Sequence, residues 1–210
     1  MTEVLEQLAR DGSAQSRYEL LVQLSDMVDG QKDTIVDTTA ETFNAIAERI
    51  LEQLTPEGRA SFSAKVATYE WLPAELVALL ANSDFNVAKP ILEKSRLLSD
   101  NEMLSIIRKR GMAHRQAIAR RPQLNDKVID QLVELGEEKV IIDLVKNERL
   151  KIASLSYRNI IESSRGMRQL QEELINCERI PTEEYDILGK MLDASLRLRY
   201  VAKKNSRSKR

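Results

Sequence analysis

Three similar segments follow one another along the chain at a constant interval. They begin LPAELVALLAN, LSDNEMLSIIR and LNDKVIDQLVE, and their first residues, Leu72, Leu98 and Leu124, are 26 residues apart. Under this offset four columns of apolar residues align without a gap: Val77, Met103 and Ile129; Leu80, Ile106 and Leu132; Ala81, Ile107 and Val133; Leu92, Ile118 and Leu144. A repeat of this length predicts stacked structural units, because one short unit cannot bury its apolar side chains alone.

Each unit is expected to contain two short helices, since apolar residues recur within it at intervals of three and four. The expected helices cover about 73–81 and 85–95, 99–110 and 112–120, and 125–135 and 137–147. A looser fourth unit is expected over 149–177, and a last helix over 181 to about 201 is expected to cap the stack. We therefore predict an all-α fold, a HEAT/armadillo-like α-solenoid of short helical pairs.

The repeat also predicts how the chain is divided. Residues 1–69 lack the period and are expected to form an N-terminal helical bundle, while 70–201 form the helical-repeat region. We expect 1–201 to be one continuous structural unit. The remaining 202–210 are expected to be a disordered basic tail, because five of the last eight residues are positive and none is apolar. An electrostatic tether is an alternative role for this tail.

Composition supports a helical fold and restricts the available chemistry. Gly and Pro make up 12 of the 210 residues, too few for the many tight turns of β-sandwiches and barrels. The one cysteine, Cys177, cannot form an internal disulfide, and with one histidine, His114, the common Cys/His metal sites cannot be assembled within a subunit. We assign no catalytic residue, cofactor or metal ligand, and expect a protein that is not an enzyme.

The N-terminal sequence and the apolar runs predict where the protein resides. Glu3 and Glu6 lie where a secretory signal would carry positive charge. The longest uninterrupted apolar stretch, 76–81, has six residues, whereas a membrane-spanning helix needs roughly 20. We therefore expect a cytoplasmic protein without a membrane span.

A set of residues in and before the repeats forms a recognisable pattern. It comprises Ser13, Arg17, Leu20 and Leu21; Leu80, Ala81, Asp84, Val87, Ala88, Pro90, Leu92, Ser95, Leu98 and Ser99; His114, Ala117, Ile118, Ala119 and Arg121; Leu124, Val128, Leu132, Val133, Gly136, Val140 and Asn147. On these residues the chain resembles an uncharacterised bacterial family, a domain of unknown function whose repeats look HEAT-like. The resemblance covers about residues 13–200. It implies a helical-repeat fold, and it implies no activity and no catalytic residue.

The most unusual local feature is the basic segment 108–121, which carries six cations and no acid. These cations are Arg108, Lys109, Arg110, Arg115, Arg120 and Arg121. One interpretation is a solvated face that compensates helix dipoles, because helix C-termini favour cations and arginine stems cover apolar surface. The other is a binding site for an acidic partner, a phosphate or a nucleotide, since arginine recognises carboxylates and phosphates in a planar, bidentate way.

Other polar residues are more simply explained by packing. Ser95, Arg121 and Asn147 occupy equivalent places in the three units and are expected to bond helix-end groups between repeats. His114 aligns with the apolar Ala88 and Val140, so we expect it to be partly buried. Cys177 is expected to be packed or half-exposed, without a catalytic role.

The favoured function is a non-enzymatic protein–protein interaction or scaffold module. Two alternatives stay open: a HEAT-like protein that binds nucleic acid, and a sensor of a phosphate or nucleotide ligand that uses the basic segment. The formal charge is -1, while 108–121 carries +6 and 203–210 carries +5, so the rest of the chain carries -12. This separation also allows self-association between acidic and basic surfaces.

Overall fold

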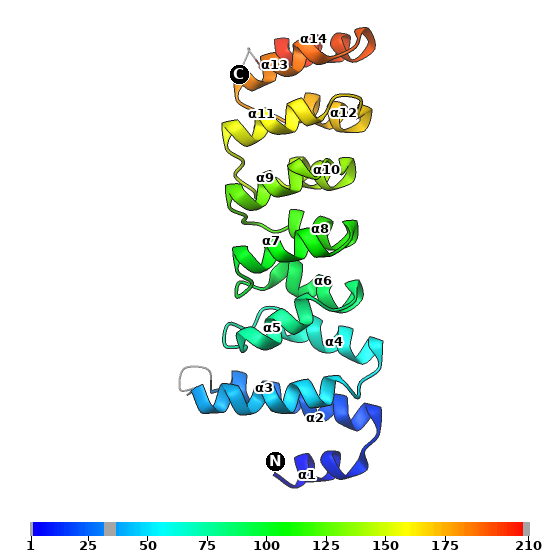
Figure 1. The fold of residues 1–210 in the computed structure, drawn as a ribbon, viewed down its shortest axis with the longest axis vertical. Helices are drawn as coiled ribbons and strands as arrows, with labels where there is room; N and C mark the ends of the chain where they lie inside the picture. Colours follow the sequence, from blue (N-terminus) through cyan, green and yellow to red (C-terminus); the bar gives the residue numbers. More distant parts are fainter. Residues whose placement is uncertain (1, 32–36, 208–210) are drawn as a thin grey trace. The chain divides into compact units, whose positions relative to one another are not determined.

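The structure is a computed structural model that describes residues 2–31 and 37–207. Within these residues it consists of fourteen helices and contains no strand, which confirms the all-α class (Figure 1). The helices are α1 (Thr2–Asp11), α2 (Ala14–Asp29), α3 (Asp37–Leu51), α4 (Pro56–Val66), α5 (Ala74–Ala81), α6 (Phe85–Lys94), α7 (Asp100–Lys109), α8 (Met112–Ala119), α9 (Asp126–Glu134), α10 (Glu138–Lys146), α11 (Ser154–Ser163), α12 (Arg168–Asn176), α13 (Thr182–Met191) and α14 (Ala194–Arg207).

Side-chain caps explain where several of these helices begin. The hydroxyl of Ser13 accepts from the amide of Ser16 at the start of α2. Thr55 caps α4 in the same way, with Pro56 at the first helical position, where its missing N–H costs nothing. Asn125 caps α9 by accepting from the amide of Val128 at 2.9 Å. Each cap satisfies one of the amides that lack a partner inside the helix.

The chain divides into two compact units, residues 1–102 and 103–210, which we call the N-terminal and C-terminal units. The boundary predicted between 69 and 70, and the single continuous unit predicted over 1–201, stay predictions. In the N-terminal unit the first predicted repeat pair packs on the preceding helices: α5 packs on α3, and α6 packs on α4. The buried hydroxyl of Ser63 in α4 donates to the carbonyl of Val87 in α6 at 2.6 Å.

The C-terminal unit contains two rows of helices. In one row α8, α10, α12 and α14 each pack on the next, and in the other α9, α11 and α13 do so (Figure 1). Most buried side chains of the described residues are apolar, and every residue of the four aligned columns is buried in its unit. The apolar pattern of the sequence therefore gives the core correctly.

The end of the chain differs from the sequence expectation. The single helix predicted over 181–201 is two helices, α13 and α14, because Asp193 caps a new helix by accepting from the amide of Leu196 at 2.9 Å. The disordered tail predicted over 202–210 is also corrected, because α14 continues to Arg207, whose guanidinium donates to the carbonyls of Cys177, Glu178 and Ile180. Residues 208–210 lie outside the described residues.

Among the helices of the described ranges, none combines the length and the apolar character that crossing a membrane requires.

Candidate interaction surface

The cations of the basic segment reach different acceptors in the C-terminal unit. Arg108, at the end of α7, donates through Nε to the side chain of Gln131 in α9 at 3.1 Å. Arg115 in α8 donates to the carbonyl of Ile107 at 2.8 Å and pairs with Glu137 at 2.8 Å. Arg120, just after α8, pairs with Asp143 in α10 at 3.1 Å. These cations therefore hold neighbouring helices together.

Burial differs strongly within the basic segment. Arg121 is buried, Arg110 is half-buried, and Lys109 is exposed at the end of α7. The side chain of Arg115 is 15% exposed and that of its partner Glu137 is 27% exposed. Because a partly buried pair is costly to separate, Arg115 is poorly placed to turn toward an external phosphate. His114 is buried, as the sequence predicts.

Ion pairs between successive helices of the even-numbered row follow a common direction. Arg115 and Arg120 at α8 pair with Glu137 and Asp143 at α10. The next helices of the row continue the pattern. Lys146 of α10 forms an ion pair with Glu173 of α12, and Arg168 of α12 forms one with Asp193 at the start of α14. We call each helix of the row one layer. Cations of one layer thus meet acids of the next. Two pairs made by α14 run the other way, Arg199 with Glu172 and Lys203 with Glu178.

Carbonyl groups at the ends of even-numbered helices are bound by side chains from the following layer. The amide of Asn147 donates to the carbonyls of Ala119 and Arg121, at 3.0 and 2.6 Å. This confirms the expected role of Asn147. Helix C-termini leave carbonyls without partners inside the helix, and these donors satisfy them.

Arg179 and Arg207 make the same kind of contact further along the row. Arg179 donates to the carbonyls of Val145 and Leu150 at the end of α10, and Arg207 donates to three carbonyls after α12. Sequence analysis missed both arginines, because the fourth unit departs from the 26-residue offset and Arg207 lies in the segment expected to be disordered. An arginine three residues after a helix end is the sequence signal for Arg179.

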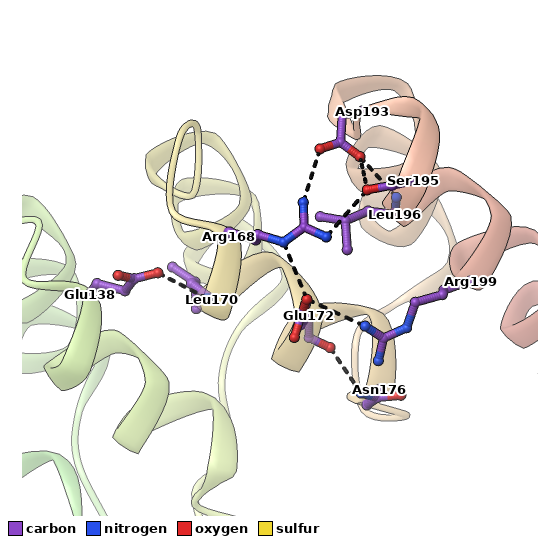
Figure 2. A network of polar contacts seen from close by, with 9 residues as sticks. All are labelled: Glu138, Arg168, Leu170, Glu172, Asn176, Asp193, Ser195, Leu196 and Arg199. Atoms are coloured by element: carbon purple, nitrogen blue, oxygen red, sulfur yellow. Dashed lines mark hydrogen bonds and ion pairs between the residues drawn. The ribbon is translucent and has the colours of Figure 1, made fainter.

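The polar network between α12 and α14 centres on Arg168, as Figure 2 shows. Its guanidinium lies between Glu172 on its own helix, at 3.5 Å, and Asp193 and Ser195 of the next layer, both at 3.3 Å. The hydrogen bond from the amide of Leu196, that from Ser195 and the charge of Arg168 hold the pKa of Asp193 below its ordinary value, although burial opposes them. The ionised carboxylate therefore both caps α14 and joins it to α12.

Aromatic rings pack against each other between α13 and α14. Tyr185 and Tyr200 stack with their centroids 4.8 Å apart, and the guanidinium of Arg207 lies 4.1 Å from the centre of the Tyr185 ring. The hydroxyl of Tyr200 donates to Asp186, which also pairs with Lys204 at 2.6 Å. A cavity of about 360 Å³ lies beside these rings. Its charged groups pair with one another, which indicates a structural role for the cluster.

The side of α14 that faces away from these rings carries exposed apolar side chains. Leu198 is 77% exposed and Val201 is 48% exposed, while Leu196 and Tyr200 on the same helix are buried. On the odd-numbered row Leu155 of α11 is 64% exposed. Exposed large apolar side chains that gather on one face mark contact surfaces more often than scattered ones do. We therefore take α14 as the candidate interaction surface, a site that sequence analysis did not identify.

Potential metal ligands are scattered: no group of three or more His, Cys, Asp and Glu residues is placed to hold a metal ion within residues 2–31 and 37–207. Cys177 is half-exposed, with its sulfur 3.9 Å from the hydroxyl of Tyr157.

The described residues define an all-helical protein whose C-terminal unit is built of short helices packed in two rows. Residues 87–210 match the model of a family described as "Uncharacterised protein conserved in bacteria (DUF2336)". This match covers more than half of the chain, and the protein belongs to that family. Neither the comparison with curated proteins nor that with solved structures found a significant match.

Proposed function

We propose that the protein is a non-enzymatic, cytoplasmic interaction or scaffold protein built as a HEAT/armadillo-like α-solenoid. The proposal is supported by the two rows of helices in the C-terminal unit, in which each helix packs on the next of its row. Stacks of this kind present long surfaces formed by many layers, and such surfaces suit extended protein partners.

The observation that carries the proposal is the contrast between the charged and the apolar surface of the C-terminal unit. Arg115 and Arg120 pair with acids of the next layer. Leu198 and Val201, by contrast, face solvent at the end of the even-numbered row. A protein partner gains most from covering exposed apolar side chains, because their removal from water is favourable.

The same contacts weaken the two alternatives of a nucleic-acid binder and a sensor of phosphate or nucleotide. Both need cations that can turn toward phosphate groups, whereas Arg115 and Arg120 are paired with Glu137 and Asp143. The proposal therefore assigns the cations of the basic segment mainly to the joints between layers.

Capture of partners by the full chain tests the proposed function. The tagged protein is expressed in its source cells, and the bound material is quantified by mass spectrometry after nuclease treatment. We expect a protein to be retained in near-stoichiometric amount.

Two binding assays in vitro complete this test. In the first assay, the binding constant for duplex DNA is measured at several salt concentrations. A plot of its logarithm against the logarithm of salt concentration with a slope of several negative units would support the nucleic-acid alternative instead. A nucleotide or phosphate that stabilises the protein by about 2.7 kcal/mol at 100 times its Kd would support the ligand sensor. Either result, without a retained protein, would overturn the proposal.

A further inference from the structure

We propose that the outer face of α14 binds an acidic amphipathic helix of another protein, as the next layer of the even-numbered row. We define this outer face by Ala194, Leu198, Val201 and Asn205, all of which are exposed. The inference rests on the proposed function, since it names the chemistry of the partner that the scaffold would bind.

The spacing along α14 forms a seam suited to one helix. The four residues of the outer face follow one another at intervals of four, three and four residues, which places them on a single side of the helix. The opposite side holds Leu196 and Tyr200, which are buried against the rest of the unit. Two large apolar residues flanked by small ones allow another helix to approach closely.

The position of α14 in its row supports a helical occupant. α10 packs between α8 and α12, and α12 packs between α10 and α14, so each has a helix on both sides. Within residues 2–31 and 37–207, α14 is the last helix of the row, and it contacts α12 and α13. A helix on the outer face would continue an interface that the unit already repeats.

The charge of α14 selects the kind of helix. α14 carries five cations and no acid. Four of them bind acids or carbonyls of the C-terminal unit, namely Arg199, Lys203, Lys204 and Arg207, so Arg197 is the cation that would meet a partner. From α8 to the start of α14, cations of one helix meet acids of the next, as with Lys146 and Glu173, whereas Arg199 and Lys203 of α14 reach back to Glu172 and Glu178. Arg197 borders the seam, is exposed and donates to the carbonyl of Lys190 at 3.5 Å. A partner with Glu or Asp beside its apolar stripe would meet Arg197 with opposite charge.

Two other occupants fit the surface less well. A second copy related by a two-fold axis would bring two α14 helices without acids together, and like charges disfavour that contact. An anionic membrane would attract the cations, but stable binding in the lipid interface needs a wide face of bulky apolar residues. The outer face of α14 offers Leu198 and Val201.

A displayed peptide library tests the proposal on the full chain. Each peptide is a helix with a Leu/Ala stripe, and the positions beside the stripe are randomised between Glu and Lys. We expect selection to enrich Glu beside the stripe and the selected peptides to bind with an affinity that falls as salt rises. The variants Leu198→Ser and Arg197→Glu should each weaken binding at least tenfold. The matched control Leu155→Ser replaces another exposed leucine, on α11, and should leave binding unchanged.

The other outcomes overturn the proposal in recognisable ways. Enrichment of Lys, an absence of selected binders, or equal weakening by Leu155→Ser would each exclude an acidic helix on α14. Sedimentation that shows self-association lost in Leu198→Ser would assign the face to a second copy. Flotation with phosphatidylglycerol vesicles, lost in the same variant, would assign it to a membrane. If capture from cells retains a protein that Leu198→Ser still binds, the proposed function stands and this inference fails.

Discussion

Individual charged residues of the basic segment act at the joints between helices. Arg115 is the clearest case, because its guanidinium binds both a backbone carbonyl in α7 and the carboxylate of Glu137 before α10. One side chain thus connects three helices. Its contribution is to the stability of the fold.

Replacing Arg115 should therefore destabilise the protein. In Arg115→Ala the partly buried Glu137 would lose its charged partner, and the lost charge-assisted bonds should lower the free energy of unfolding by about 2 kcal/mol. Urea unfolding followed by circular dichroism measures this change. The control Arg108→Ala removes an exposed side chain that binds Gln131, and should stay within about 0.5 kcal/mol. Equal changes in the two variants would contradict the structural role of Arg115.

For individual residues, the sequence predicts which side chains are buried better than it predicts which charged side chains form ion pairs. The apolar columns and the buried His114 follow from periodicity, because a helix places every third or fourth residue on one side. The partner of Arg115, Glu137, lies 22 residues away in the sequence with α9 in between, and several acids occur at similar separations. Which acid it meets depends on how two helices pack, so residue spacing alone cannot identify it.

At the scale of elements, the contact between α13 and α14 depends on the absence of a side chain at Gly189. A Cβ atom placed there would lie 2.5 Å from Cε1 and Cζ of the Tyr200 ring. That ring stacks on Tyr185 and donates to Asp186, so it cannot easily move aside. Gly189 therefore lets α14 lie directly against α13.

Gly189→Ala should destabilise the protein although alanine favours helices. The clash should cost about 1–3 kcal/mol, and the gain in helix propensity is about 1 kcal/mol. We expect a lower midpoint of thermal unfolding. Gly58→Ala in α4 is the matched control, because its nearest non-neighbouring atoms would lie at 3.4 Å or more, so the midpoint should hold or rise. An unchanged midpoint for Gly189→Ala would show that the two helices are not in close contact.

The cap of α14 makes the stability of this element depend on pH. The pKa of Asp193 is held below its ordinary value of 3.8, first by the amide of Leu196. A lowered folded-state pKa means that the ionised carboxylate stabilises the fold above pH 3.8, and that this stabilisation is lost as pH falls through the folded value. Asp193→Asn keeps a cap but removes the titration. Its urea midpoint should fall less than that of the wild type as the pH is lowered past 3.8. Superimposable pH profiles would contradict the role of the charge.

The boundary between α13 and α14 shows why elements near the chain end are harder to predict. The run over 181–201 keeps a helical apolar period, so it resembles one helix. Asp193 followed by Leu196 is the available signal for a new start, since aspartate is a preferred N-cap. The polar neighbours of Arg207 predict a disordered tail, whereas its carbonyl acceptors follow α12 and lie 27 to 30 residues away in the sequence.

At the scale of the whole molecule, the apolar period predicts an all-helical fold correctly, while the repeat and the division of the chain stay predictions. The first predicted pair, α5 and α6, packs on α3 and α4 and belongs to the unit 1–102. Periodicity reports which residues share a pattern, while a compact unit depends on which surfaces bury each other. Here the N-terminal helices bury the first pair although they lack the repeat.

We propose that the protein binds a protein partner through α14, and that the basic segment mainly joins neighbouring helices. Site-specific photo-crosslinking in cells tests this proposal most directly. A photoreactive amino acid is placed at Leu198 in one strain and at Lys109, the exposed cation of the basic segment, in another. We predict a strong crosslink to a protein from position 198 and none above background from position 109. Crosslinks from position 109 alone, to a protein or to nucleic acid, would contradict the proposal.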